Sequence, residues 1–331
     1  MVTRFIKAFN IIAFAVGTTC CGAWASEVSH ELSKNANVCP TIEPAPGTAW
    51  PELHYHQPGR SWCYAVAIGD LMSFATNTKI SSIALANFTE RGDDSAKDKI
   101  KAYLYNDHNF LYRFSFRGQS YQKAFSVAQK SMICEWSILD QLRDSQGVRD
   151  IFLDDLFYSL EDLRKRNPEQ LRKRLHGLFD SLRSGFAEEL FSMAQNQRRP
   201  LIDMAVDLSC DKKVGVSGIR LMTQDLTSLS QEQALIKIKN LLVQQKVIGI
   251  SYSSHLIYQP QYASWQGANH ASLIVGQYLD SSDKVCKYIV RSTDEYTCEV
   301  ADPSIKCKHG FFVIPREQAI EAISDIIWLE R

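Results

Sequence analysis

A cysteine, a histidine and a glutamine of this chain have the types and positions that covalent acyl-transfer chemistry requires. Cys63 lies near the start of an apolar run, 62–74, which predicts a buried helix beginning near Ser61. A thiol in the first turn of a helix feels the positive end of the helix dipole and unpaired backbone N–H groups, and both stabilise the thiolate. Because the thiolate is the nucleophilic form, Cys63 is the candidate nucleophile. Taken alone, a cysteine in an apolar helix is more often a buried core residue.

The histidine and the glutamine supply the two other functions that such a reaction needs. His270 precedes an apolar stretch that predicts a strand over 271–278. A positioned imidazole can hold a thiolate as an ion pair and later protonate a leaving amine. Gln57 precedes Cys63 by six residues, and its side-chain amide can donate to an oxyanion beside the backbone N–H of Cys63. Each residue alone is more often structural, so the hypothesis depends on all three.

Together these residues resemble the active-site motifs of the papain-like cysteine peptidases, in the form common in exported bacterial members. The match around the cysteine comprises Gln57, Cys63, Tyr64 and Ala65. The match around the histidine comprises His270-Ala271 followed by Val275-Gly276-x-Tyr278. The segments 288–291 and 310–315 are similar to two later strands of the family. The resemblance covers roughly residues 48–130 and 200–316.

The resemblance implies a fold, a reaction and a role for each matched residue. The implied fold is α+β, with a helical lobe, a β-barrel-like lobe and a cleft between them. Cys63 attacks the peptide carbonyl, His270 protonates the leaving group, and Gln57 helps to hold the oxyanion. No metal and no organic cofactor is implied, and the partner is a peptide or protein substrate. The expected substrate contacts are Gly118, in a loop that resembles a substrate-binding loop, Tyr64, and Trp265. Trp265 stands just before the histidine motif, where it can line the leaving-group side of the cleft, although such a Trp more often only packs.

Two departures from the family pattern change what we expect. The chain between Cys63 and His270 is longer than the roughly 130–150 residues usual in the family, and we interpret about 140–200 as a helical insertion. Ser292 falls at the position of the Asn that orients the histidine. A Ser hydroxyl is shorter than an Asn amide, so reduced activity is expected. Asp294 is the alternative orienting residue if the loop differs.

Two other functions remain open at this level. A papain-like fold that has lost catalysis would bind peptides or a protein partner without cutting them, and the Ser at 292 supports this alternative. A cysteine acyl-transfer enzyme of the transglutaminase or amidase kind is the second alternative. Gln57, six residues before Cys63, argues against it.

The insertion has the pattern of an amphipathic helical hairpin. Apolar residues recur every three or four positions over 153–163. Asn167 as N-cap, Pro168 at the first helical position and Gln170 closing a capping box predict a second helix, whose apolar stripe continues to Phe186. The basic cluster 172–174 is interpreted as a solvated helix face rather than an anion site.

The rest of the chain predicts helices first and strands afterwards, which favours the α+β class. Helices are expected over 120–130 and, after a capping box of Ser230 and Gln233, up to about Gln245. Strands are expected over 247–252, 271–278, 287–291 and 310–314. The expected domains are an N-terminal arm over 26–50, a peptidase domain over 51–316 and a C-terminal helix or tail over 317–331.

The first 25 residues have the pattern of a secretory signal peptide. Arg4 and Lys7 precede a short apolar stretch, 11–16. Ala23 and Ala25 are small residues at the two positions that a signal peptidase recognises, so cleavage is expected between Ala25 and Ser26. An exported protein, periplasmic or secreted, is therefore expected. The alternative is a stable N-terminal membrane anchor, which the short length of the apolar stretch does not favour.

Cysteine numbers agree with export. Of the nine cysteines, Cys20 and Cys21 lie in the expected signal, which leaves seven. Cysteines tend to pair in an oxidising compartment, and an odd number leaves at least one thiol over. We expect Cys63 to be that thiol, with six cysteines available for disulfides.

The charge balance bears on which kinds of binding partner the chain can attract. The chain carries 37 Lys and Arg against 37 Asp and Glu. A neutral chain has no long-range attraction for nucleic acid or an anionic membrane surface. We therefore expect no nucleic-acid partner. We also expect no stable membrane anchor and a monomeric protein.

Overall fold

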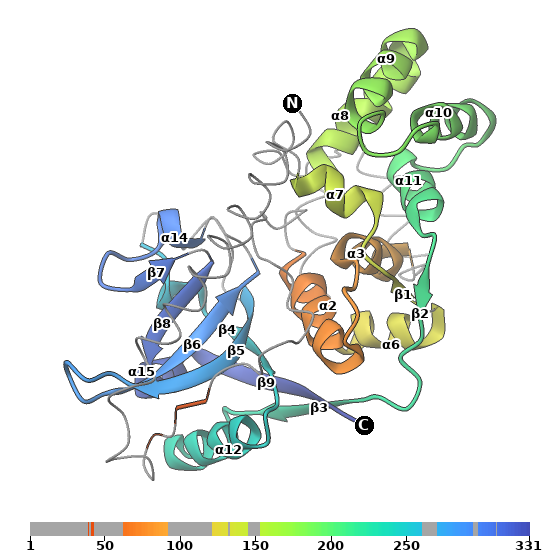
Figure 1. The fold of residues 1–331 in the computed structure, drawn as a ribbon. Helices are drawn as coiled ribbons and strands as arrows, with labels where there is room; N and C mark the ends of the chain where they lie inside the picture. The colour runs from red at the N-terminus through yellow and green to blue at the C-terminus, as the bar shows by residue number, and fades with distance from the viewer. Residues whose placement is uncertain are drawn as a thin grey trace, which may run out of the picture.

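The structure is a computed structural model that describes residues 39, 41–42, 62–91, 121–131, 133–144, 153–259, 270–293, 297–308 and 310–331. The helices up to residue 209 gather on one side of the molecule, and a seven-stranded antiparallel sheet with the later helices forms the other (Figure 1). The α+β class predicted from the sequence is therefore confirmed. The expected signal peptide lies outside the described residues. Among those residues, no helix has the length and apolar character that a membrane crossing requires.

The strands of the main sheet follow the order β3-β9-β4-β5-β6-β8-β7. Their bounds, in chain order, are β3 Arg220–Asp225, β4 Ile248–Tyr252, β5 His270–Leu279, β6 Cys286–Ser292, β7 Lys306–Lys308, β8 Phe311–Pro315 and β9 Ile323–Glu330. The four strands expected from the sequence form as β4, β5, β6 and β8. Within the described part of the chain, β3 and β7 are the edges of an open sheet, in place of the barrel-like lobe that was expected.

The C-terminal segment is not only a helix or tail. Helix α15 (Arg316–Ala322) is followed by β9, which pairs with both β3 and β4 inside the sheet. Ile326, Ile327 and Trp328 of β9 are all buried. A run that is apolar on both faces forms a strand covered on both sides, so the last residues of the chain belong to the core.

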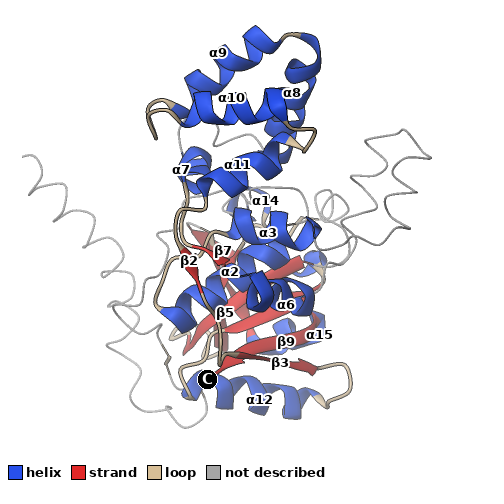
Figure 2. Ribbon diagram, turned by 90° about the vertical axis from the view of Figure 1, so that its right-hand side faces the viewer, coloured by secondary structure: helices blue, strands red, loops and turns tan. Residues whose placement is uncertain are grey.

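Helices cover both faces of the sheet. On one face, α2 (Cys63–Thr76) packs against β5 and is surrounded by α3 (Ser82–Arg91) and α6 (Tyr121–Ser131) (Figure 2). On the other face, α12 (Gln231–Val243) and α15 pack on a second apolar cluster. Neighbouring residues of β5 alternate between the clusters, since Leu273 faces α2 and Ile274 faces α12. The predicted helices at 61–74, 120–130 and after Ser230 are confirmed as α2, α6 and α12.

The N-terminal arm is attached to the sheet. A disulfide joins Cys39 to Cys286 at the start of β6. Ile42 forms an antiparallel bridge with Gln277 of β5, with N···O distances of 3.0 and 3.2 Å. A Cβ atom on Gly276 would lie 2.3 Å from the Ile42 carbonyl oxygen. Glycine at 276 therefore permits this close approach of the arm.

The helical insertion is larger than a hairpin. It contains α7 (Ile138–Asp144), α8 (Leu153–Arg166), α9 (Pro168–Phe179), α10 (Phe186–Asn196) and α11 (Leu201–Ser209). The predicted end of the second helix was wrong, because α9 ends at Phe179 and the chain turns over 180–185. Gly185 has a φ of 80° in this turn, and Phe186 starts a new helix. Figure 2 shows α8, α9 and α10 at the end of the molecule farthest from α12.

The junction of α8 and α9 shows how closely the two helices follow each other. The Asn167 side chain accepts a hydrogen bond from the Gln170 backbone N–H at 3.1 Å, as an N-cap does. The expected reciprocal bond from Gln170 to the Asn167 N–H does not form. That N–H donates instead to the Leu163 carbonyl at 2.8 Å, because α8 ends directly before the cap.

Polar contacts join the helices of the insertion. His176 of α9 has Nδ1 at 2.8 Å from an Asp180 carboxylate oxygen and Nε2 at 2.7 Å from a Glu188 carboxylate oxygen at the start of α10. Arg172 of the basic cluster lies 2.7 Å from Glu188. All these side chains are at the surface, so the cluster is a solvated face, as expected from the sequence.

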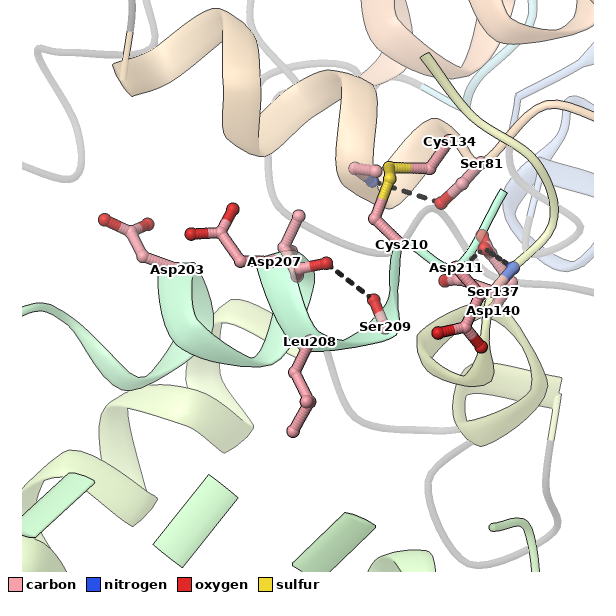
Figure 3. The surroundings of a disulfide bond; sticks show 12 residues. Ser81, Cys134, Ser137, Asp140, Asp203, Asp207, Leu208, Ser209, Cys210 and Asp211 are labelled. Carbon is pink, nitrogen blue, oxygen red and sulfur yellow. Dashed lines mark hydrogen bonds between the residues drawn. A yellow bond between two sulfur atoms is a disulfide. The ribbon is translucent and has the colours of Figure 1, made fainter. Parts of the chain in front are cut away.

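A disulfide closes the neck of the insertion. The two short strands β1 (Ile133–Cys134) and β2 (Lys213–Val214) pair, and Cys134 bonds to Cys210. Figure 3 shows this disulfide beside Ser81, which precedes α3. Every residue of α7 through α11 lies between the two bonded cysteines, so the insertion is a loop fastened at its base.

Candidate active site

Cys63 is the first residue of α2, where the sequence placed it. Residues 63–66 of this first turn are uncharged, and the Trp62 carbonyl accepts hydrogen bonds from the N–H groups of Ala65 and Val66 at 2.9 and 3.1 Å. The positive end of a 14-residue helix therefore faces the thiol, which favours the thiolate.

Cys63 is also the cysteine of the described residues that stays outside the disulfides. The six others form Cys39–Cys286, Cys134–Cys210 and Cys298–Cys307. The prediction that Cys63 is the odd thiol is confirmed. Its side chain is partly exposed, so a reagent can reach it.

His270 is the first residue of β5 and is 4% exposed. It pairs across the sheet with Tyr252 of β4. The Tyr252 ring lies edge-on to the imidazole with 5.6 Å between ring centroids, and the Tyr258 ring does the same at 6.0 Å. Two aromatic walls therefore fix the plane of the imidazole and limit its contact with water.

Tyr252 packs against the candidate base, and the charge of the candidate nucleophile affects its pKa. Burial raises the pKa of Tyr252 well above its ordinary value, and the charge of the Cys63 thiolate is among the further causes. The Tyr252 ring packs edge-on to His270. Since α2 also packs against β5, Cys63 and His270 are the first residues of two elements that contact each other.

Tyr121 is a second tyrosine beside the thiol. It begins α6, and its hydroxyl donates to the Ile250 carbonyl of β4 at 2.7 Å. Burial raises the pKa of Tyr121 well above its ordinary value, and the Cys63 charge adds to the rise. Tyr121 therefore stays neutral beside the thiol and ties the helices to the sheet.

Thr293, the residue that follows β6, lies beside the imidazole. Thr293 is buried, and its Oγ1 lies 3.4 Å from Nε2 of His270 and 3.0 Å from the Ala271 carbonyl oxygen. Ser292, the expected orienting residue, is buried opposite Ser272 of β5. Sequence reasoning missed Thr293, although it is the immediate neighbour of the position that the family motif indicated.

A buried ion pair joins α2 to β6. Arg291 Nη2 lies 3.0 Å from Asp70 Oδ2, and the two side chains are 0% and 5% exposed. Asp70 is two turns after Cys63 on α2, and Arg291 directly precedes Ser292. The pair therefore fixes the helix that carries Cys63 to the strand that leads to Thr293.

Of the other predicted site residues, three are not described by the structure and one lies in the apolar core. Gln57, Gly118 and Trp265 lie outside the described residues, as does the alternative Asp294. Tyr64 is 5% exposed and belongs to the apolar core, which does not favour a substrate contact through its ring. In the described part of the chain, no group of three or more His, Cys, Asp or Glu side chains is placed to hold a metal ion.

Comparisons with known proteins give little beyond these residues. No family model matches the sequence, and no curated protein matches it. Among solved structures, the chain is similar to PepW from Lactobacillus rhamnosis, with 11% identity and a TM-score of 0.47 over 99% of this chain and 92% of that chain. A likeness this weak carries no functional argument, so the function has to be argued from the site itself.

Proposed function

We propose that this chain is an exported papain-like cysteine peptidase in which Cys63 is the nucleophile and His270 the acid and base. One observation carries the proposal: the cysteine left outside the disulfides begins helix α2, and this helix packs against β5, the strand that His270 begins. A thiol, an imidazole and a helix N-terminus in one place are what thiolate catalysis needs.

The proposed reaction has two steps. The Cys63 thiolate attacks the peptide carbonyl carbon, the C–N bond breaks, and the imidazolium of His270 gives its proton to the leaving amine. Water then attacks the thioester, His270 takes a proton from it, and the acid leaves as the thiolate re-forms. The backbone N–H of Cys63 and the Gln57 amide stabilise the oxyanion in both steps.

The substrate and the compartment follow from the same reasoning. A peptide or protein is the substrate that this chemistry attacks. Three disulfides fit an oxidising compartment, which supports export after cleavage near Ala25-Ser26. The insertion between Cys134 and Cys210 adds no residue to the proposed chemistry.

Labelling of the nucleophile tests the proposal. The oxidised protein is treated with a thiol-directed peptidyl epoxide, and the modified residue is mapped by mass spectrometry without reduction. We expect the label on Cys63, loss of the label in Cys63→Ser, and slow labelling of wild-type protein unfolded in urea. A folded protein that reacts no faster than the unfolded one would refute the proposal.

A binding protein without catalysis is the second candidate, because Ser292 stands where the resemblance calls for an orienting Asn. The two candidates differ in their response to iodoacetamide and to dye-labelled casein. A peptidase has a fast-reacting Cys63 and cleaves casein. A binding protein has a slow Cys63 and leaves casein intact.

A further inference from the structure

We infer that Thr293 is the positioning residue of His270, an inference that rests on the proposed function of the Cys63–His270 pair. Thr293 comes directly after β6, in the first turn of chain beyond the strand. Its side chain is buried, and its Oγ1 lies 3.4 Å from His270 Nε2. Thr293 is thus in reach of Nε2. The hydrogen bond that one ring nitrogen makes sets the tautomer, and so decides whether the other nitrogen can exchange protons with the substrate.

The hydrogen-bond directions decide the tautomer. A threonine hydroxyl has one hydrogen, and Oγ1 of Thr293 donates it to the Ala271 carbonyl at 3.0 Å. Towards His270 only the lone pairs of Oγ1 remain, so the Nε2–H of the ring must be the donor. Nδ1 is then the nitrogen that gives and takes protons during the reaction.

This contact favours the charged imidazole. An imidazolium donates a stronger hydrogen bond than a neutral ring does, so Thr293 stabilises the state in which His270 pairs with a thiolate. The distance of 3.4 Å is longer than the usual 2.7–3.2 Å. Catalytic hydrogen bonds in an enzyme without substrate are often long and shorten in the complex.

The surroundings keep the contact dry. Among the described residues, Tyr252 and Tyr258 are titratable side chains whose rings pack against the imidazole, and both are buried. Burial raises the pKa of Tyr252, so it remains neutral while His270 titrates. Exclusion of water strengthens a hydrogen bond to a charged ring.

Ser292 is held elsewhere by the register of the sheet. It pairs with Ser272, two residues beyond His270 on β5, and its N–H donates to the Gly310 carbonyl at 2.8 Å. The next residue, Thr293, follows the end of β6, and its Oγ1 lies 3.0 Å from the carbonyl oxygen of Ala271, the neighbour of His270. Thr293 therefore takes the place that the family motif gives to its neighbour.

Three variants test the inference. Thr293→Val keeps the shape and removes the hydroxyl, while Thr293→Ser keeps the hydroxyl. The matched control is Thr89→Val, because Thr89 is buried in α3 and donates to the Leu85 carbonyl at 2.7 Å. All are compared in kcat and KM on dye-labelled casein, and in the rate of Cys63 alkylation by iodoacetamide between pH 4 and 9.

For Thr293→Val we expect kcat to fall by about tenfold to a hundredfold, the effect of one hydrogen bond to a charged group. KM should change less, and Thr293→Ser should recover most of the loss. The thiolate–imidazolium pair is lost at high pH when His270 gives up its proton. In Thr293→Val the alkylation profile should show this loss at a lower pH than in the wild type. Thr89→Val should leave the kinetics and this profile unchanged, and if Thr293→Val does not fold, Thr293→Ala replaces it.

Two failures are distinguishable. If wild-type Cys63 reacts as slowly as the unfolded chain, the proposed function fails. If wild-type Cys63 is reactive and Thr293→Val has the same kcat and alkylation profile, only the role of Thr293 is overturned. A loss that Thr293→Ser does not recover, or that Thr89→Val shares, also overturns it.

Discussion

Removal of the buried Asp70–Arg291 pair should show how firmly α2 is fixed to the sheet. The two side chains are 5% and 0% exposed, with 3.0 Å between Nη2 and Oδ2. Replacing one partner leaves the other charge buried without its counter-ion, which costs about 3–5 kcal/mol. We therefore expect Asp70→Leu and Arg291→Met each to lower the free energy of unfolding by about that amount.

The double variant gives the decisive comparison. Replacing both partners of a buried ion pair by apolar residues of similar volume is often neutral or stabilising. Asp70→Leu/Arg291→Met should therefore lie within about 1 kcal/mol of the wild type, so the two losses should not add. Urea unfolding of the oxidised protein, followed by tryptophan fluorescence, measures all four proteins. Arg172→Met, at an exposed pair with Glu188, is the control and should change the free energy of unfolding far less than either buried substitution does.

Two results would refute this reasoning. Single variants that lose less than about 1 kcal/mol would show that the interior accommodates either charge without its partner. A double variant that loses the sum of the single losses would show that the residues act independently. If the double variant is stable but alkylates slowly at Cys63, the pair sets the position of the nucleophile as well as the stability of the fold.

The other predictions concern the insertion, one histidine and one glycine. Deleting 145–198, which leaves α7, α11 and the neck disulfide, should keep the alkylation rate of Cys63 but lower solubility, because the apolar faces covered by α8–α10 become exposed. Hydrogen bonds, first to Glu188, raise the pKa of His176. The stability that charged His176 adds to the fold is therefore complete below about pH 6.5 and is lost as the pH rises through the raised pKa. His176→Gln should be less stable than the wild type only at the lower pH. Gly276→Ala should displace the N-terminal arm, since the new Cβ would lie 2.3 Å from a carbonyl oxygen of the arm, and reductant should then open the Cys39–Cys286 bond faster.

Each of these has its own control. A soluble, folded deletion with an unreactive Cys63 would mean that the insertion belongs to the site. Equal losses for His176→Gln at pH 5 and pH 9 would mean that its charge does not matter. Gly177→Ala is the control for Gly276→Ala, because a Cβ there meets nothing within 4 Å; equal reduction rates in the two variants would contradict the packing argument.

Local signals in the sequence were sufficient for the elements that carry the site. The apolar run after Ser61 became α2, and the capping box of Ser230 and Gln233 formed with both of its bonds. A cap or an apolar run depends on a few adjacent residues, so it can be read without the fold. Cys63 was recognised for the same reason, because its place in the first turn is a local property.

Properties that depend on distant partners were not predictable. Asp70 inside an apolar run signals that a buried charge needs a partner, but nothing local identifies Arg291. The strand β9 lies between β3 and β4, and that place depends on pairing with segments that are far from β9 in the sequence. Thr293 was missed because the direction of a side chain beyond a strand end depends on the loop that follows.

The order of the cysteines along the chain has a consequence for biosynthesis. Cys39 bonds to Cys286, 247 residues later. Cys63 comes after Cys39 in the sequence and before all the other cysteines that form disulfides. In a chain that crosses a membrane N-terminus first, Cys39 and Cys63 reach the oxidising side long before Cys286 does. An oxidant that joins cysteines as they arrive would bond Cys39 to Cys63 and so block the proposed nucleophile. Under the proposed export, thiol–disulfide exchange would have to release Cys63 from that bond, and we expect the yield of correctly paired protein to depend on the supply of a disulfide isomerase.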